Sequence, residues 1–327
     1  MGFLDKLRGQ TATSVEAPFL DKALGDEEAR RLRSELEQDR WQEAFQVVDR
    51  ARDWDDREFL SWTLTDFPGR PRWIDEMVKA NSNSATAPLL RAAHSLKWAW
   101  EARGSGKAES VQHKGWDPFL QRLQEAEADL HRTAELDPAD PTPWAYLLIS
   151  ALGLEKGAQN ASAILAEARK RDRWHHVALA NFQMLCTKKW GGSHELMFDV
   201  ARQTAREAPE GNGCHTLIAE AHIERWLYMV HWDKDIQAAR DYFERKEVAG
   251  EIRQAAERYL SSPKLKKTRR LYVDRGIFTF CFADMLDWDA ARDQFEAMGP
   301  AIPEYPWVLA GDPVAHLTRV RERALKG

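Results

Sequence analysis

Six histidines in the middle of the chain are the side chains whose type and spacing could most directly do chemistry. They are His175, His176, His194, His215, His222 and His231. An interval of seven residues is two turns of an α-helix, so His215 and His222 are expected on one helix face. With His175 or His176 from a neighbouring element, they could form a metal site. A structural role for each ring is the alternative, and the spacing favours it, because zinc ligands on one helix usually lie closer together.

A glycine-rich segment, Lys188-Lys-Trp-Gly-Gly-Ser-His194, is similar to a phosphate-binding loop only in composition. A P-loop follows a strand and carries its lysine after the glycines, whereas Lys189 and Trp190 precede Gly191 and Gly192. We expect the glycines to let one helix end and the next begin, with Trp190 filling the gap between them. A loop that contacts a ligand is the alternative interpretation.

The sequence shows no arrangement for nucleophilic catalysis. Ser193, His194 and Glu195 are adjacent in the chain, which prevents them from converging as a triad. No nucleophile elbow, HExxH motif or dinucleotide-binding glycine pattern is present. The cysteines are few, far apart and in apolar helical contexts, which predicts buried thiols in a reducing compartment: Cys186, Cys214 and Cys281.

Two groups of charged residues are candidate binding sites. Glu220 and Glu224 are expected on the exposed side of one helix, where they could contact a basic peptide. The only basic run in the chain is expected to be a solvated loop, with an anion site as the alternative: Lys264, Lys266, Lys267, Arg269 and Arg270.

The composition narrows the class of protein. The chain of 327 residues has a formal charge of −5 with both signs mixed throughout, so a nucleic-acid partner is not expected. No window approaches the roughly 18 apolar residues of a membrane span. The first eight residues are amphipathic but lack the apolar core of a signal peptide. We therefore expect a cytoplasmic location and no membrane association.

Short amphipathic helices separated by Pro, Gly and Asp breaks would position these residues. Breaks near Pro138, Asp172 and Pro209 recur at roughly 34 to 37 residues, the length of a two-helix repeat. The apolar run from Gly276 to Phe282 could pass for a strand. We interpret it as a helix because Leu286-Asp-Trp-Asp-Ala-Ala291 follows with a tight turn and another helical pattern.

Domain boundaries follow from the same patterns. Residues 1–20 are expected to form a flexible N-terminal tail, and residues 21–327 a single helical-repeat domain. Within that domain, we expect the stretch 104–115 to be a long exposed loop, because helical hairpins continue on both sides of it. The alternative is that it separates an N-terminal lobe, 21–103, from a repeat array, 116–327.

Several segments resemble tetratricopeptide repeats. The family closes a second helix with Leu-Asp-Pro and starts the next with a bulky residue, as in Leu136-Asp-Pro138 followed by Trp144. Its Asp-aromatic-x-x-Ala turn matches Asp287-Trp-Asp-Ala-Ala291, and Trp41 with Glu43-Ala44 matches in part. Ile218, Ala219 and His222 follow Pro209 at corresponding positions. About half of the chain is covered, and 160–200 departs from the pattern.

A second resemblance concerns Lys189-Trp-Gly-Gly-Ser193 ahead of Met197-Phe198, with Trp307 after the C-terminal hairpin. These features are similar to a bacterial family of helical, repeat-like proteins of unassigned function, which implies a fold and no activity.

The expected fold is all-α, an α-solenoid of antiparallel helix hairpins. Stacked hairpins form a groove that binds peptides or helices, so we expect a non-enzymatic protein-interaction scaffold without a cofactor. Its groove is predicted to contain Ala145, Ile149, Asn181, Thr216, Glu220 and Glu224. The alternative is an enzyme or a small-ligand or metal-binding protein that uses the His-rich central hairpins.

Overall fold

The computed structural model describes residues 18–51, 53–104 and 113–326, and helices account for most of them. The α-helices are α1 (Glu27–Leu36), α2 (Gln42–Asp49), α3 (Trp54–Thr63), α4 (Arg72–Ala80), α5 (Thr86–Arg103), α6 (His113–Leu136), α7 (Thr142–Gly153), α8 (Gly157–Arg171), α9 (His176–Leu185), α10 (His194–Glu207), α11 (Thr216–Tyr228), α12 (Ile236–Arg240), α13 (Lys246–Leu260), α14 (Leu271–Asp284), α15 (Trp288–Met298) and α16 (Pro313–Lys326). Shorter elements are the strands β1 (Phe19–Leu20) and β2 (Ala301–Ile302) and the turns η2 (Lys188–Trp190), η3 (Gly213–His215), η4 (Met229–Asp233) and η5 (Trp307–Ala310).

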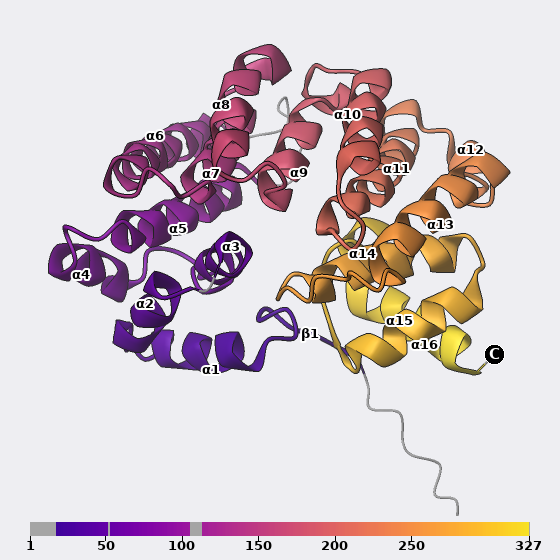
Figure 1. The fold of residues 1–327 in the computed structure, drawn as a ribbon, viewed down its shortest axis with the longest axis horizontal. Helices are drawn as coiled ribbons and strands as arrows, with labels where there is room; N and C mark the ends of the chain where they lie inside the picture. Colours follow the sequence, from indigo (N-terminus) through magenta and orange to yellow (C-terminus); the bar gives the residue numbers. More distant parts are fainter. Residues whose placement is uncertain (1–17, 52, 105–112, 327) are drawn as a thin grey trace, which may run out of the picture.

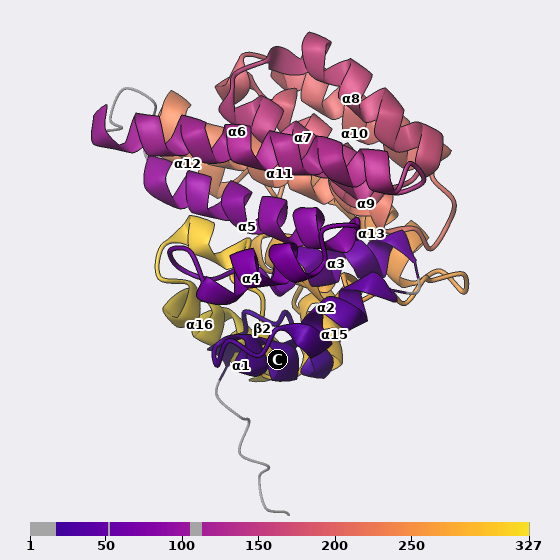
Figure 2. The same ribbon diagram turned by 90° about the vertical axis from the view of Figure 1, so that its left-hand side faces the viewer.

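Most helices that are adjacent in the chain pack against each other, and further contacts join helices that are two or three positions apart in the chain. The long helices α5 and α6 lie along one another (Figure 2). α7 contacts α9, α9 contacts α11, and α11 contacts α14. In Figure 1, α7, α9 and α14 lie toward the middle of an arc, whereas α6, α8 and α12 lie at its outside. We call α7, α9, α11 and α14 the inner helices. No helix in the described ranges is long and apolar enough to cross a membrane.

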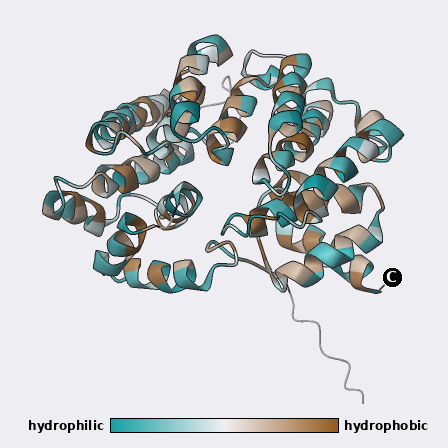
Figure 3. Ribbon diagram, in the orientation of Figure 1, coloured by the Kyte–Doolittle hydropathy of each residue, from teal (hydrophilic) through white to brown (hydrophobic). Residues whose placement is uncertain are grey.

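Each helix carries both hydrophobic and hydrophilic residues, as Figure 3 shows, and the hydrophobic ones form two separate cores. The smaller core joins α1, α2, α3, α4 and the start of α5, from Ala23 to Leu90. The larger core begins on α5 at Leu89 and continues to Ala324 on α16. We call residues 21–80, which include α1 to α4, the N-terminal lobe.

The strand β1, which precedes the N-terminal lobe, pairs in parallel with β2 of the C-terminal part of the chain. Figure 1 shows β1 between α1 and the C-terminal helices. The backbone amide of Phe19 donates to Pro300 at 3.1 Å, and that of Asp21 donates to Ile302 at 3.1 Å. Phe19 and Leu20, which the sequence placed in a flexible tail, are therefore held by backbone hydrogen bonds. Residues 1–17 of that predicted tail lie outside the described residues.

Ion pairs join the same two parts of the chain. Arg269 pairs with Asp26 at 2.5 Å and with Glu28 at 2.7 Å, and Lys266 pairs with Asp55 at 2.6 Å. Together with the β1–β2 pair, these contacts form what we call the closing interface. The prediction that the basic run is a solvated loop is thus wrong for Arg269, which is 17% exposed and paired with carboxylates distant in sequence. Lys266 is exposed as predicted, although it too is paired.

Local sequence signals predicted several helix boundaries correctly. The apolar run 276–282 lies within α14 and is helical. Ser193 caps α10 by accepting from the amide of Leu196 at 3.1 Å, and Asp26 caps α1 in the same way. Residues 105–112, most of the predicted loop, lie outside the described residues, and α6 begins at His113.

Candidate functional site

The connection between α9 and α10 places Lys189 against the inner helix α11. The ammonium of Lys189 lies 2.6 Å from a carboxylate oxygen of Glu224 on α11, and both side chains are largely buried. Two glycines make this turn. Gly191 has a φ of 85°, and a Cβ on Gly192 would lie 2.1 Å from the backbone oxygen of Cys186. A side chain at Gly192 would displace the loop that carries Lys189.

The next residue, Trp190, anchors the same loop to α5. Its ring packs edge-on against Trp100 with centroids 5.9 Å apart. The guanidinium of Arg103 lies 5.4 Å from both ring centroids, within the range of cation–π attraction. Trp190 remains partly exposed, so an aromatic surface accompanies the ion pair.

A second group of charges lies where α14 begins. The guanidinium of Arg270 is 3.1 Å from Asp274 on the same helix and 3.4 Å from Glu220 on α11. The hydroxyl of Tyr259 donates to the other oxygen of Asp274 at 2.7 Å. Arg270 is thus also neutralised by the chain's own carboxylates, contrary to the solvated-loop prediction.

α3 of the N-terminal lobe adds a carboxylate to this region. Glu58 is 6% exposed, and its nearest polar partner is the hydroxyl of Tyr146 on α7, at 3.5 Å. On α5, Lys97 donates to the backbone oxygen of Trp62 and lies 4.3 Å from the centroid of that ring. We call the seven charged residues of these groups the central charged cluster: Glu58, Lys97, Lys189, Glu220, Glu224, Arg270 and Asp274.

Burial shifts the pKa values of several members of this cluster toward 7. Desolvation raises the pKa of Glu58 to about 7, and the positive charge of Arg270 opposes that rise. Burial also raises the pKa of Glu220 to about 7 and the pKa of Asp274 to about 6. In the opposite sense, burial lowers the pKa of Lys97 to about 7. The cluster can therefore gain or release protons near pH 7, a property that is concentrated at functional sites.

The predicted groove residues fall into two sets. Ala145 and Thr216 have no exposed surface, so their side chains cannot contact a partner directly in this structure. Ile149, Asn181 and Glu220 are partly exposed, and the amide of Asn181 donates to the backbone oxygen of Ala145 at 3.0 Å. Glu224, which was expected on an exposed helix face, is instead 7% exposed and paired with Lys189.

The structure does not bring the central histidines together. His176 exchanges a hydrogen bond with Thr216, whereas His222 contacts the hydroxyl of Tyr242 at 2.8 Å and Glu251 at 3.2 Å. His215 ends the 3₁₀ helix η3 and is the N-cap of α11, and its ring contacts the backbone oxygen of Pro209 and not His222. Within the described part of the chain, no group of three or more candidate ligands could hold a metal ion.

The cysteines are buried and unpaired by disulfides, as predicted. Burial raises the pKa of the Cys186 thiol to about 11 and raises that of Cys214 and Cys281 well above the usual range. A thiol with a raised pKa is a poor nucleophile, which leaves these side chains with a packing role.

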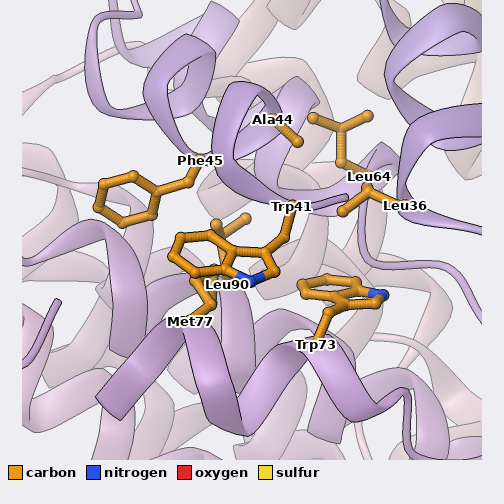
Figure 4. A pocket seen from close by; sticks show the side chains of 8 residues that line it. All are labelled: Leu36, Trp41, Ala44, Phe45, Leu64, Trp73, Met77 and Leu90. Atoms are coloured by element: carbon orange, nitrogen blue, oxygen red, sulfur yellow. The ribbon is translucent and has the colours of Figure 1, made fainter. Parts of the chain in front are cut away.

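A separate pocket lies in the N-terminal lobe, with indole rings of Trp41 and Trp73 on its wall (Figure 4). Its lining consists only of apolar side chains: Leu36, Trp41, Ala44, Phe45, Leu64, Trp73, Met77 and Leu90. All of them belong to the smaller core or pack against it, so the pocket offers no acid, base or charged group.

The central charged cluster is thus centred on α11 and the start of α14, with further side chains contributed by η2, α3 and α5. The sequence nominated Lys189, Glu220 and Glu224 separately, and it did not identify Glu58, Lys97, Arg270 and Asp274 as members of one site. The i, i+4 spacing of Arg270 and Asp274 is the one local signal that could have indicated a pair.

Comparisons of this chain with protein-family models, with curated proteins and with solved structures found no match. Its function therefore has to be inferred from the geometry of its own residues.

Proposed function

We propose that the protein is a non-enzymatic scaffold that binds a protein or peptide partner at the surface of its inner helices. In this proposal the chain is an α-solenoid of helix hairpins similar to tetratricopeptide repeats. Such stacks present a continuous face built from one helix of each pair, and that face accommodates extended peptides or helices.

The single observation that supports the proposal is the central charged cluster beside the inner helices α11 and α14. Glu220 and Glu224 lie on α11 and Arg270 and Asp274 at the start of α14, whereas η2, α3 and α5 contribute the other three members. The inner helices contact one another in succession, α7 with α9, α9 with α11 and α11 with α14. Each of them also packs against a helix that neighbours it in the chain. The Lys189–Glu224 and Arg270–Glu220 pairs lie on this row, with side chains that retain some solvent exposure. Trp190 follows Lys189 directly, burial and the nearby charges of Glu220 and Glu224 raise the pKa of Tyr305, and both rings are partly exposed. Aromatic and arginine side chains of this kind commonly supply the binding energy of protein interfaces.

The pairing also changes the expected chemistry of recognition. Glu220 and Glu224 were expected to receive a basic peptide, but Arg270 and Lys189 already neutralise them. A partner would meet paired charges of both signs. Recognition would then depend on the direction of each pair and on the aromatic surface beside it, rather than on net charge.

A charge swap tests this proposal without changing net charge. The double variant Lys189→Glu, Glu224→Lys keeps an ion pair and reverses its direction on the inner surface. The matched control Arg173→Glu, Glu207→Arg reverses an exposed pair of 2.8 Å elsewhere on the protein. We expect affinity purification from the native host to recover one stoichiometric partner with the wild type and the control, and at least tenfold less with the inner swap. Equal recovery with all three proteins would contradict the proposal. Circular dichroism must show that both variants are folded.

A further inference from the structure

We propose that the basic segment Lys264–Arg269 is a docking site for acidic protein segments, which carboxylates of the N-terminal lobe occupy in this structure. The inference rests on the proposed binding function and names the chemistry of a partner. Its site, however, is the connection between α13 and α14 and not the inner surface.

Arg269 shows what the segment recognises. Its guanidinium lies 2.5 Å from Asp26, 2.7 Å from Glu28 and 3.4 Å from Asp56. Asp26 is the N-cap of α1, and Glu28 is in its first turn. Asp56 lies in the first turn of α3, so carboxylates from two helix starts converge on one cation.

Lys266 repeats the pattern. Its ammonium lies 2.6 Å from Asp55 and 3.5 Å from Asp53, the N-cap of α3. Acidic residues are favourable in the first turn of a helix, where they face the positive end of its dipole. The segment thus holds acidic helix starts, a chemistry that a partner protein can also present.

The contacts of Lys266 are exchangeable, whereas those of Arg269 are more enclosed, because the side chains of Arg269 and Asp56 are 17% and 7% exposed. The side chains of Lys266, Asp53 and Glu28 are 53%, 46% and 41% exposed, and exposed ion pairs contribute little to stability and weaken further with salt. Five carboxylates also face two cations here, so the lobe's acids repel one another while they bind. The N-terminal lobe has its own hydrophobic core, which would persist if its carboxylates were displaced.

The segment keeps its shape independently of the N-terminal lobe. The backbone amide of Lys266 donates to Gly211 at 3.0 Å, and that of Gly211 donates to Arg258 at 2.8 Å. Gly211 has a φ of 76°, and a Cβ there would lie 2.2 Å from the backbone oxygen of Lys264. Leu265 packs against the larger core. The cations are therefore pre-positioned for a second acidic ligand, which lowers the cost of binding.

The test uses a fluorescein-labelled hexaglutamate peptide and fluorescence anisotropy at fixed ionic strength. The double variant Asp53→Asn, Asp55→Asn removes two competing carboxylates, and asparagine retains the ability to cap α3. We expect this variant to bind the peptide about tenfold more tightly than the wild type. Adding Lys266→Ala to it should return the affinity to the wild-type level or below.

The control is the double variant Glu43→Gln, Glu207→Gln. It removes the same number of carboxylates from exposed pairs with Arg31 and Arg173, and so frees two cations elsewhere. Equal affinity in the control and in the Asp53/Asp55 variant would overturn the inference, as would no effect of Lys266→Ala. Tighter binding of a labelled thymidine oligonucleotide of equal charge would overturn the assignment to acidic protein segments.

The two proposals fail separately. If the basic segment does not bind hexaglutamate, the effect of the inner charge swap on partner recovery can still be measured. Conversely, if the inner charge swap does not reduce partner recovery, the hexaglutamate titration can still show whether Asp53 and Asp55 compete with the peptide for Lys266.

Discussion

Replacing Arg57 by alanine should lower the free energy of unfolding by about 3–5 kcal/mol, because it leaves a buried carboxylate without its cation. The guanidinium of Arg57 on α3 donates to Asp140 at 2.6 Å, and the two side chains are 6% and 0% exposed. Arg57 also donates to the hydroxyl of Thr86 at 3.0 Å and to the backbone oxygen of Val48 at 3.2 Å. One side chain therefore joins α3 to α2, to α5 and to the turn before α7.

Chemical denaturation followed by circular dichroism measures this loss. The informative comparison is the double variant Arg57→Met, Asp140→Asn, which leaves no charge at the site. The introduced asparagine amide can still accept from the backbone amide of Thr142, as the Asp140 carboxylate does at 2.7 Å. We expect the double variant to be more stable than Arg57→Ala, because the penalty of an unpaired buried charge is gone. If the free energy of unfolding of Arg57→Ala is within about 1 kcal/mol of the wild-type value, the ion pair contributes little to stability.

Replacing Glu58 by glutamine should stabilise the protein at pH 8 and leave it unchanged near pH 4. The folded state raises the pKa of Glu58 from its ordinary 4.5 to about 7, because burial disfavours the charged form. The folded protein therefore binds this proton more tightly, and stability falls as the pH rises from 4.5 through 7. Glutamine removes the penalty, which is about 3 kcal/mol above pH 7.

The measurement is the difference in unfolding free energy between Glu58→Gln and the wild type across this pH range. Glu135 on α6 is 68% exposed, so Glu135→Gln is a control whose difference should stay flat. A Glu58→Gln difference that is the same at pH 5 and pH 8 would show that Glu58 is not desolvated in the folded protein. Glutamine can still accept a hydrogen bond from Tyr146, so that contact does not confound the comparison.

The all-α class and many helix boundaries could be predicted because they depend on neighbouring residues. Apolar spacing and the following turn were sufficient to assign 276–282 to a helix rather than a strand. Ser193 and Asp26 cap their helices as their residue types indicate. These signals act over one or two helical turns, and a single sequence displays them directly.

The closing interface could not be predicted, because its partners lie far apart in the chain. Arg269 and Asp26 are separated by 243 residues, and β1 and β2 are too short to show an alternating pattern. A basic run looks the same in sequence whether water or carboxylates surround it. The composition of 264–270 therefore suggested a solvated loop, and only the fold shows which acids meet it.

Only part of the candidate site could be predicted, because its contacts also join residues that are far apart in the chain. Lys189 and Glu224 were singled out for the loop and the groove, but the pair between them depends on how α9 and α11 stack. Glu58 had no distinguishing feature in the sequence, because burial and not residue type raises its pKa. The ring partners of His215 and His222 could not be predicted either, because Pro209, Tyr242 and Glu251 lie on other elements of the fold.

Hydroxyl-radical footprinting of the protein, alone and with its purified partner, tests the proposed inner binding surface most directly. Trp190 and Tyr305 lie beside the central charged cluster, whereas Trp232 lies on η4 and is 36% exposed. We predict that the partner strongly reduces oxidation of Trp190 and Tyr305 and leaves Trp232 unchanged. Protection of Trp232 together with unchanged oxidation of Trp190 and Tyr305 would contradict binding at the inner helices.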